Sequence, residues 1–146
     1  MNISLALYKG PGRIGDAIIR RWTRSPYSHC ELVIDGVCYS SSMMDGCVRA
    51  KSIGLDPASW DLIALPWANK TLAMAHFEET KGQPYDWFGL IGSQVFNARS
   101  NEPAAAFCSE WCAAALGIPS PETFSPCTLA ELCEWVNDKR ELERAA

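Results

Sequence analysis

Residues 29–42 read His-Cys-Glu-Leu-Val-Ile-Asp-Gly-Val-Cys-Tyr-Ser-Ser-Ser and give the clearest hairpin signal in the chain. Residues 29–34 and 37–42 are rich in side chains that favour strands. Between them, Asp35-Gly36 is a dipeptide typical of a two-residue primed turn. The stretch therefore predicts two antiparallel strands joined by a tight turn.

Counting outward from this turn places three pairs of residues opposite one another: Ile34 and Val37, Glu31 and Ser40, and His29 and Ser42. Directly opposed residues share one face of a sheet. His29 and Glu31 are therefore expected on the same face as Ser40.

The rest of the chain predicts strands first and mostly helices after them. Strands are expected at residues 2–8, 47–51 and 60–65. Helices are expected at residues 13–23, 70–81, 84–97, 106–116 and 128–139, the last opened by a capping box from Thr128 to Glu131. This order indicates an α+β fold in which an antiparallel sheet packs against helices. With no repeat or linker, residues 1–146 are expected to form a single domain.

The composition is that of an ordinary globular protein. A formal net charge of −4 leaves no electrostatic footprint for nucleic-acid binding. The arginines at 13, 20, 21 and 24 are interpreted as the solvated face of a short helix. The N-terminus lacks the features of a signal peptide, and no apolar run approaches the roughly 18 residues that a membrane helix needs. The protein is therefore expected to be soluble and cytoplasmic, with no integral membrane segment.

The chain has seven cysteines, an odd number that is high for its length. They stand at positions 30, 38, 47, 108, 112, 127 and 133. Without a secretory signal they are interpreted as reduced thiols, most of them small buried side chains. A zinc site is disfavoured because no Cys-x-x-Cys pair is present. No metal or other cofactor is therefore expected.

Cys108 lies in a second informative motif, Phe107-Cys-Ser-Glu-Trp-Cys112, at the start of a predicted helix. In the first helical turn, the partial positive charge of the exposed N–H groups favours a thiolate. The same N–H groups can stabilise the oxyanion of a tetrahedral intermediate. Alternatively, Cys108 is a core residue beside Phe107 and Trp111, and its position alone leaves both interpretations open.

His29 is the better of the two histidines as a base for this thiol, because it is held on a strand. His76 lies in a predicted helix among solvent-facing charges and is interpreted as a surface or boundary residue. A catalytic imidazole needs a third group to orient it. The predicted face offers Glu31, Ser40 and Ser42 for that role. Glu31 could bond the far ring nitrogen, or it could be a partly buried carboxylate paired with Ser40, and the sequence does not separate these interpretations.

Tyr85 lies in the segment Gly82-Gln-Pro-Tyr-Asp-Trp-Phe-Gly89, at the start of a predicted helix. Its hydroxyl could donate a hydrogen bond to a developing oxyanion. Equally, Tyr85 could be part of an aromatic core with Trp87 and Phe88. From the residues alone the two interpretations have equal weight.

Taken together, the His29 strand, the segment ending at Tyr85 and the Cys108 helix resemble the NlpC-type branch of the papain-like cysteine peptidases. In ordinary members of that branch the cysteine helix precedes the histidine strand. Here the histidine comes first, as in the circularly permuted YiiX-like and lecithin:retinol acyltransferase-like group. The resemblance covers roughly residues 8–135 and implies a permuted papain-like fold.

By this resemblance, Cys108 would be the nucleophile, His29 the base and Tyr85 a residue beside the oxyanion. The family's third polar residue, often a second histidine, corresponds here to about Ser40. Serine orients an imidazole more weakly than a carboxylate does, so the resemblance leaves open whether Glu31 takes this role.

The resulting expectation is a cysteine hydrolase that cleaves an amide or peptide bond in a small substrate. Peptidoglycan stem peptides are the commonest substrates of the family, and the compact chain looks like phage or prophage relatives. A cytoplasmic chain would reach the wall only by lysis or virion delivery. The alternatives are a lipid acyl hydrolase, acyltransferase or thioesterase, or an inert binding domain of the same fold. The oligomeric state is left open.

Overall fold

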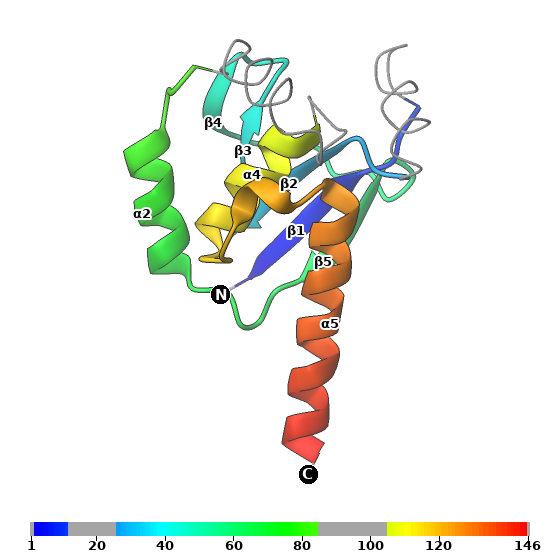
Figure 1. The fold of residues 1–146 in the computed structure, drawn as a ribbon. Coiled ribbons are helices and arrows are strands. Elements are labelled where there is room, and N and C mark those ends of the chain that lie inside the picture. The colour runs from blue at the N-terminus through cyan, green and yellow to red at the C-terminus, as the bar shows by residue number, and fades with distance from the viewer. Residues whose placement is uncertain (1, 12–25, 85–104, 146) are drawn as a thin grey trace.

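The computed structural model describes residues 2–11, 26–84 and 105–145, which form an antiparallel sheet and a layer of helices. The five strands are β1 (Ile3–Tyr8), β2 (His29–Ile34), β3 (Val37–Ser42), β4 (Cys47–Lys51) and β5 (Trp60–Ala64). Their order is β4-β3-β2-β1-β5, and every neighbouring pair is antiparallel (Figure 1). The strand that begins with His29 is therefore the central strand of the sheet.

The turn between β2 and β3 is the predicted primed turn. Asp35 has a φ of 49° and Gly36 a φ of 86°, which is the signature of type I′. The register pairs Ile34 with Val37, Val33 with Cys38 and Leu32 with Tyr39. The predicted pairing is therefore confirmed next to the turn, whereas the predicted partners of His29 and Glu31 lie beyond this paired stretch.

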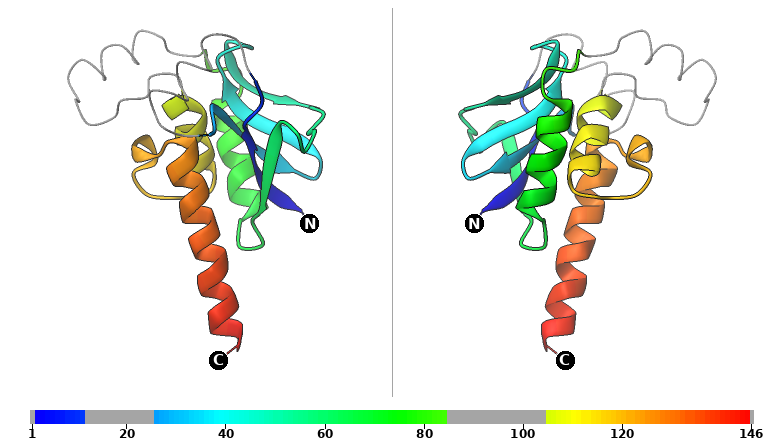
Figure 2. Two further views of the ribbon diagram at one scale, coloured as in Figure 1. Left: turned by 90° about the vertical axis from the view of Figure 1, so that its right-hand side faces the viewer. Right: turned by 90° about the vertical axis from the view of Figure 1, so that its left-hand side faces the viewer.

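The helices are α2 (Lys70–Thr80), α4 (Ala105–Ala115) and α5 (Pro126–Ala145), with a short 3-10 turn, η1 (Pro121–Thr123), before α5. All three helices lie on the same face of the sheet (Figures 1 and 2). α4 is the central one, since it contacts β2 and β3 below and both α2 and α5 at its sides. The α+β class with an antiparallel sheet is thus confirmed.

The two faces of β2 have different neighbours. Cys30, Leu32 and Ile34 point into the main core, together with residues of α4 and α5. Val33 instead belongs to a smaller cluster on the opposite face, with Ala6 of β1. Side chains alternate along a strand, so His29 and Glu31 lie on the face of Val33.

Most of the predicted element boundaries agree with the structure to within one residue. β2, β3 and β4 have the predicted bounds, β1 and β5 are each one residue shorter, α2 ends one residue early and α4 is displaced by one residue. The predicted helix at 13–23, with the four clustered arginines, and residues 85–97 of the helix predicted at 84–97 fall outside the described ranges. Pro84, the predicted first residue of that second helix, is described and forms a β-bridge with Cys47 instead of a helical turn. Within those ranges, no helix combines the length and apolar composition needed to cross a bilayer.

The predicted start of the last helix is wrong by two residues. α5 begins at Pro126, and the Ser125 side chain accepts from the Thr128 backbone N–H at 3.2 Å. In return, the Ser125 backbone N–H donates to the Thr128 hydroxyl at 2.9 Å. The capping box is therefore Ser125 to Thr128, with Pro126 at the first helical position, where its missing N–H costs nothing.

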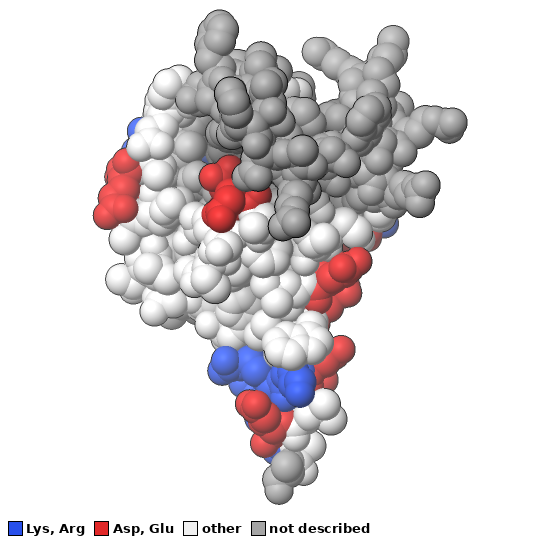
Figure 3. Space-filling model, viewed as in Figure 1, with Lys and Arg blue, Asp and Glu red and all other residues white. Residues whose placement is uncertain are grey.

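The predicted end of α5 near residue 139 is also too early, since the helix continues to Ala145. Residues 140–145 read Arg-Glu-Leu-Glu-Arg-Ala, all good helix formers without a breaker. This second half extends away from the body of the protein (Figures 1 and 2) and carries charges of both signs (Figure 3).

Gly117 ends α4 and gives the first testable prediction. Its φ is +72°, its N–H donates to Ala114 and the next N–H donates to Ala113, which is a Schellman motif. We expect Gly117→Ala to lower the free energy of unfolding by about 1–2 kcal/mol, because a Cβ is disfavoured in the left-handed region. A methyl group there would meet only the end of the half-exposed Leu72 side chain, which can move aside.

Urea unfolding of Gly117→Ala measures this loss, with Gly54→Ala as the matched control. Gly54 has no positive φ, and a Cβ there meets nothing within 4 Å. The control is expected to stay within about 0.5 kcal/mol of the wild type. Equal losses in the two variants would contradict the assigned cap.

Candidate catalytic site

The structure brings the thiol of Cys108 and the imidazole of His29 together. Cys108 is the fourth residue of α4 and is 1% exposed, and α4 packs on β2. His29 is the first residue of β2, and its side chain is 26% exposed. The two side chains share a hydrogen bond and a Coulombic interaction. Two motifs far apart in the sequence thus meet at one end of the sheet.

Glu31 holds the other side of the imidazole. Its Oε1 lies 2.7 Å from Nε2 of His29. Because Nε2 is engaged in this way, Nδ1 is the ring nitrogen left to face the Cys108 sulfur. Residues 29 and 31 share a face of β2 by strand alternation, so the local fold sets this contact.

Arg49 of β4 neutralises Glu31. Its guanidinium donates to both carboxylate oxygens, at 2.7 Å and 2.6 Å, and also to Asp45 at 2.7 Å. Glu31 is 1% exposed, and a buried carboxylate needs such a partner to remain charged. Arg49 therefore fixes both the charge and the position of the group that orients His29.

Of the candidates for the orienting group, Glu31 contacts the imidazole. Ser40 is buried, and its hydroxyl donates to the backbone carbonyl of Cys30 at 2.9 Å. Ser40 also lies opposite Arg49 in the pairing of β3 with β4. The serine thus stabilises the strands around the site, while the carboxylate holds the ring.

Contacts within the site shift the pKa values of His29, Cys108 and Glu31. Burial disfavours the charged ring of His29, but the charge of Cys108 and its hydrogen bonds to Cys108 and Glu31 outweigh burial and raise its pKa to about 10. A hydrogen bond from Cys30, opposed by burial and reinforced by His29, holds the pKa of Cys108 well below its usual range. Burial also opposes ionisation of Glu31, yet Arg49 and then His29 keep its pKa low. Both shifts favour a thiolate facing an imidazolium at neutral pH.

Trp60 of β5 flanks the imidazole on the face away from the helices. Its ring lies 6.5 Å from the His29 ring in an edge-on arrangement and 5.0 Å from the ring of Tyr8. Tyr8 is the strand partner of both His29 and Trp60. The strand pairing thus places an aromatic surface beside the candidate base.

The sequence reasoning missed Arg49 and Trp60. Arg49 had a usable signal, because a glutamate in the central strand of a sheet needs a cation on a neighbouring strand. Trp60 is placed by β5 pairing with β1, and no short motif encodes that pairing.

Tyr85, the proposed oxyanion donor, lies outside the described residues. The segment that precedes it runs beside β4, where Gln83 accepts from Val48 at 3.1 Å and Gly82 donates to Val48 at 2.9 Å. Pro84 bridges to Cys47, the first residue of β4. No described contact tests the role predicted for Tyr85.

His76 is separate from this cluster. It lies half-buried on α2, as the sequence predicted for a boundary residue, with its ring 5.5 Å from that of Trp111. Burial lowers its pKa, with Glu79 acting weakly in the opposite direction. The neutral ring packs on an aromatic side chain and has no thiol beside it in the described part of the chain.

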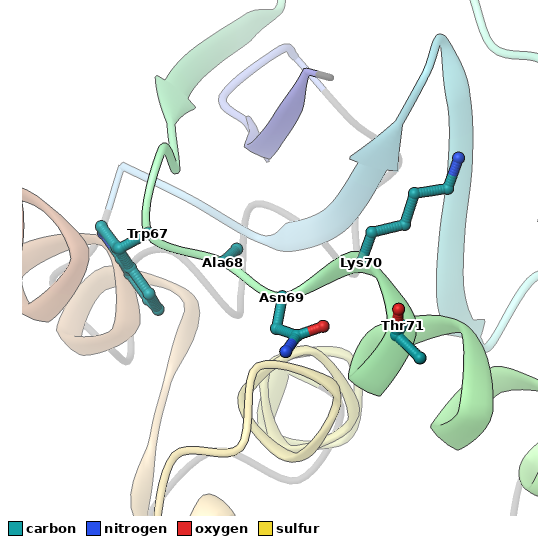
Figure 4. A pocket seen from close by; sticks show the side chains of 5 residues that line it. All are labelled: Trp67, Ala68, Asn69, Lys70 and Thr71. Atoms are coloured by element: carbon teal, nitrogen blue, oxygen red, sulfur yellow. The ribbon is translucent and has the colours of Figure 1, made fainter.

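A surface hollow at the start of α2 is a poor alternative site. It is lined by Trp67, Ala68, Asn69, Lys70 and Thr71 (Figure 4). Two of its polar side chains already have structural partners, since Asn69 caps α2 and Lys70 pairs with Asp35. It lies beyond the Ala64 end of β5, whereas His29 lies level with Trp60 at the other end. Over the described ranges, moreover, no group of three or more His, Cys, Asp or Glu side chains is placed to hold a metal ion.

No protein-family model, curated protein or solved structure compared with this chain matches it. The likeness to permuted NlpC-type peptidases therefore depends on short motifs of this chain. The contacts among Cys108, His29 and Glu31 are a structural observation that does not depend on those motifs.

The contact between Glu31 and His29 gives the second prediction. Glu31→Gln removes a negative charge next to the ring, so we expect the pKa of His29 to fall from about 10 by about 1–3 pH units. An NMR titration of the imidazole measures this value. Asp45→Asn is the matched control, because it also removes a carboxylate from Arg49 but not one bonded to His29. An equal fall in both variants would contradict a direct role of Glu31.

Proposed function

We propose that the protein is a cysteine hydrolase in which Cys108 is the nucleophile and His29 the general acid and base. The observation that carries the proposal is the meeting of the Cys108 thiol and the His29 imidazole, with Glu31 on the far ring nitrogen. A nucleophile, a base and a group that orients the base, bonded in this order, are the parts of a thiol triad. A merely structural cysteine needs none of them.

The proposed reaction begins when the Cys108 thiolate attacks the carbonyl carbon of an amide, forming a C–S bond and an oxyanion. The amino end of α4 carries partial positive charge and favours negative charge near the sulfur. The oxyanion then collapses, the C–N bond breaks, and the His29 imidazolium gives its proton to the departing amine. An acyl group remains on the sulfur as a thioester.

In the second half of the reaction, neutral His29 takes a proton from water as that water attacks the thioester. The C–S bond breaks, the acid product leaves, and the thiolate and imidazolium are restored. Glu31 accepts from Nε2 of His29 throughout, which keeps Nδ1 directed at the sulfur. Its bond to Arg49 keeps it ionised as the ring gains and loses its proton.

The fold that best accommodates this site is the permuted papain-like fold of the NlpC type. Two features support this assignment: the order of the motifs, and a cysteine helix that packs on the histidine strand of an antiparallel sheet. By the same resemblance, we propose a peptidoglycan-type peptide as the substrate.

The third prediction concerns Cys108 itself. Cys108→Ala is expected to abolish hydrolysis of a peptidoglycan-derived peptide while keeping the unfolding curve close to that of the wild type, because only one sulfur is removed. Cys127→Ala is the matched control and should leave turnover unchanged. This cysteine is the second residue of α5, its sulfur bonds Glu131 of the same helix at 3.8 Å, and it is not among the groups that shift the pKa of His29. Full activity in Cys108→Ala would exclude the proposed mechanism.

Alkylation separates an active thiol from an inert domain with the same fold. At neutral pH, iodoacetamide is expected to modify Cys108 at least about tenfold faster than the partly exposed Cys47 and Cys127, because an ordinary thiol is only a few per cent ionised. Mass spectrometry of the digested protein identifies the labelled residue. Uniform labelling of all the cysteines would favour an inert binding domain.

A further inference from the structure

Three sulfur atoms meet where α4 packs on β2. Cys108 and Cys112 are one turn apart on α4, and Cys30 follows His29 on β2. The Cys30 sulfur lies 3.9 Å from that of Cys112 and also forms a side-chain hydrogen bond with Cys108. All three residues are at most 1% exposed. The proposed nucleophile thus lies beside a second buried thiol.

We infer that Cys30 is a positioning residue, whose S–H group donates a hydrogen bond to the Cys108 sulfur and holds it as a thiolate. The inference depends on the proposed function, because it assigns a role within that site. No covalent step is involved, and the Cys30 proton stays on its own sulfur.

Cys30 remains a donor under the conditions in which Cys108 is ionised. Burial first, and then its hydrogen bonds to Cys108 and Cys112, raise the pKa of Cys30 well above its usual range. Its single proton has two sulfur acceptors within reach, that of Cys112 and that of the Cys108 thiolate. A hydrogen bond to a charged acceptor is roughly twice as strong as one to a neutral acceptor, so the proton goes to Cys108.

The sulfur of Cys112, 3.9 Å from that of Cys30, is the competing acceptor for that proton. Its own S–H points at the backbone carbonyl of Cys30, 4.0 Å away. Cys108 is the sulfur that interacts with the charge of His29, so it is the stronger acceptor of the Cys30 proton. The three thiols therefore form a short directed chain in which Cys30 is the donor to the nucleophile.

The position of Cys30 complements that of His29. Consecutive residues of a strand point to opposite faces, so His29 lies on the Val33 face and Cys30 on the helix face. A buried thiolate needs compensation for its lost hydration. The end of β2 provides two groups that compensate for it: the positive charge of His29 and the neutral S–H donor of Cys30.

Replacing the Cys30 side chain removes none of the other groups that act on Cys108, including the backbone hydrogen bond from Cys30 itself. From β2, Cys108 is faced by His29, with Glu31 behind the ring and Arg49 of β4 behind Glu31. The other thiol on its own helix is Cys112, with which Cys133 of α5 interacts electrostatically. A change in the ionisation of Cys108 in a Cys30 variant therefore reports on the Cys30 donor.

The test is the pH dependence of Cys108 ionisation in the full chain. Thiolate absorbance in the ultraviolet, taken as the difference between each protein and its own Cys108→Ala variant, gives the titration without requiring reagent access. Cys30→Ala is expected to move the titration of Cys108 upward by about one pH unit, as loss of one charge-assisted hydrogen bond implies. Cys30→Ser keeps a donor and is expected to restore most of the wild-type curve. Cys30→Val replaces Cys30→Ala in this comparison if the cavity left by alanine prevents folding.

Cys112→Ala is the matched control. It removes a sulfur from the same cluster but not the donor to Cys108, so its curve is expected to coincide with that of the wild type. Coincidence of the Cys30→Ala and wild-type curves would overturn the inference and leave the proposed hydrolase standing. A wild-type Cys108 that titrates like an ordinary thiol would instead overturn the proposed function.

Discussion

The ion pair between Glu31 and Arg49 is the interaction on which the rest of the site depends. Glu31 lies in the central strand with 1% of its surface exposed, where an unpaired carboxylate would take up a proton. Two hydrogen bonds from one planar guanidinium keep it ionised and fix its orientation. Only an ionised Glu31 can accept from His29 and at the same time favour the charged ring. The sheet therefore sets the protonation of the histidine through a residue on β4.

Strand alternation turns this local arrangement into a site. One face of β2 presents His29 and Glu31, and the other presents Cys30 to the helix layer. α4 packs on that second face and brings Cys108 to the end of the strand where His29 begins. A single strand thus supplies the proposed base, the group that orients it and, by our inference, a donor to the proposed nucleophile.

Much of the fold could be predicted from the sequence because its signals are local. Asp35-Gly36 determines the turn and with it the bounds of β2 and β3. The predicted cap of α5 was wrong. The sequence suggests a capping box from Thr128 to Glu131, but the box that forms joins Ser125 to Thr128, three residues earlier. Arg49 and Cys30 were not singled out, since their roles arise from strand pairing and from packing of α4 on β2. Such contacts join residues far apart in the chain, and no spacing in the sequence encodes them.

The central claim is that Cys108 and His29 form an ion pair, in which Cys108 is a thiolate and His29 an imidazolium. An NMR titration of the His29 imidazole in the wild type and in Cys108→Ala tests it most directly. The account predicts a pKa of about 10 in the wild type and a value about 1–3 pH units lower once the sulfur is gone, because the ring then loses a neighbouring negative charge. The same pKa in both proteins would show that the ring does not sense Cys108, and would contradict the account.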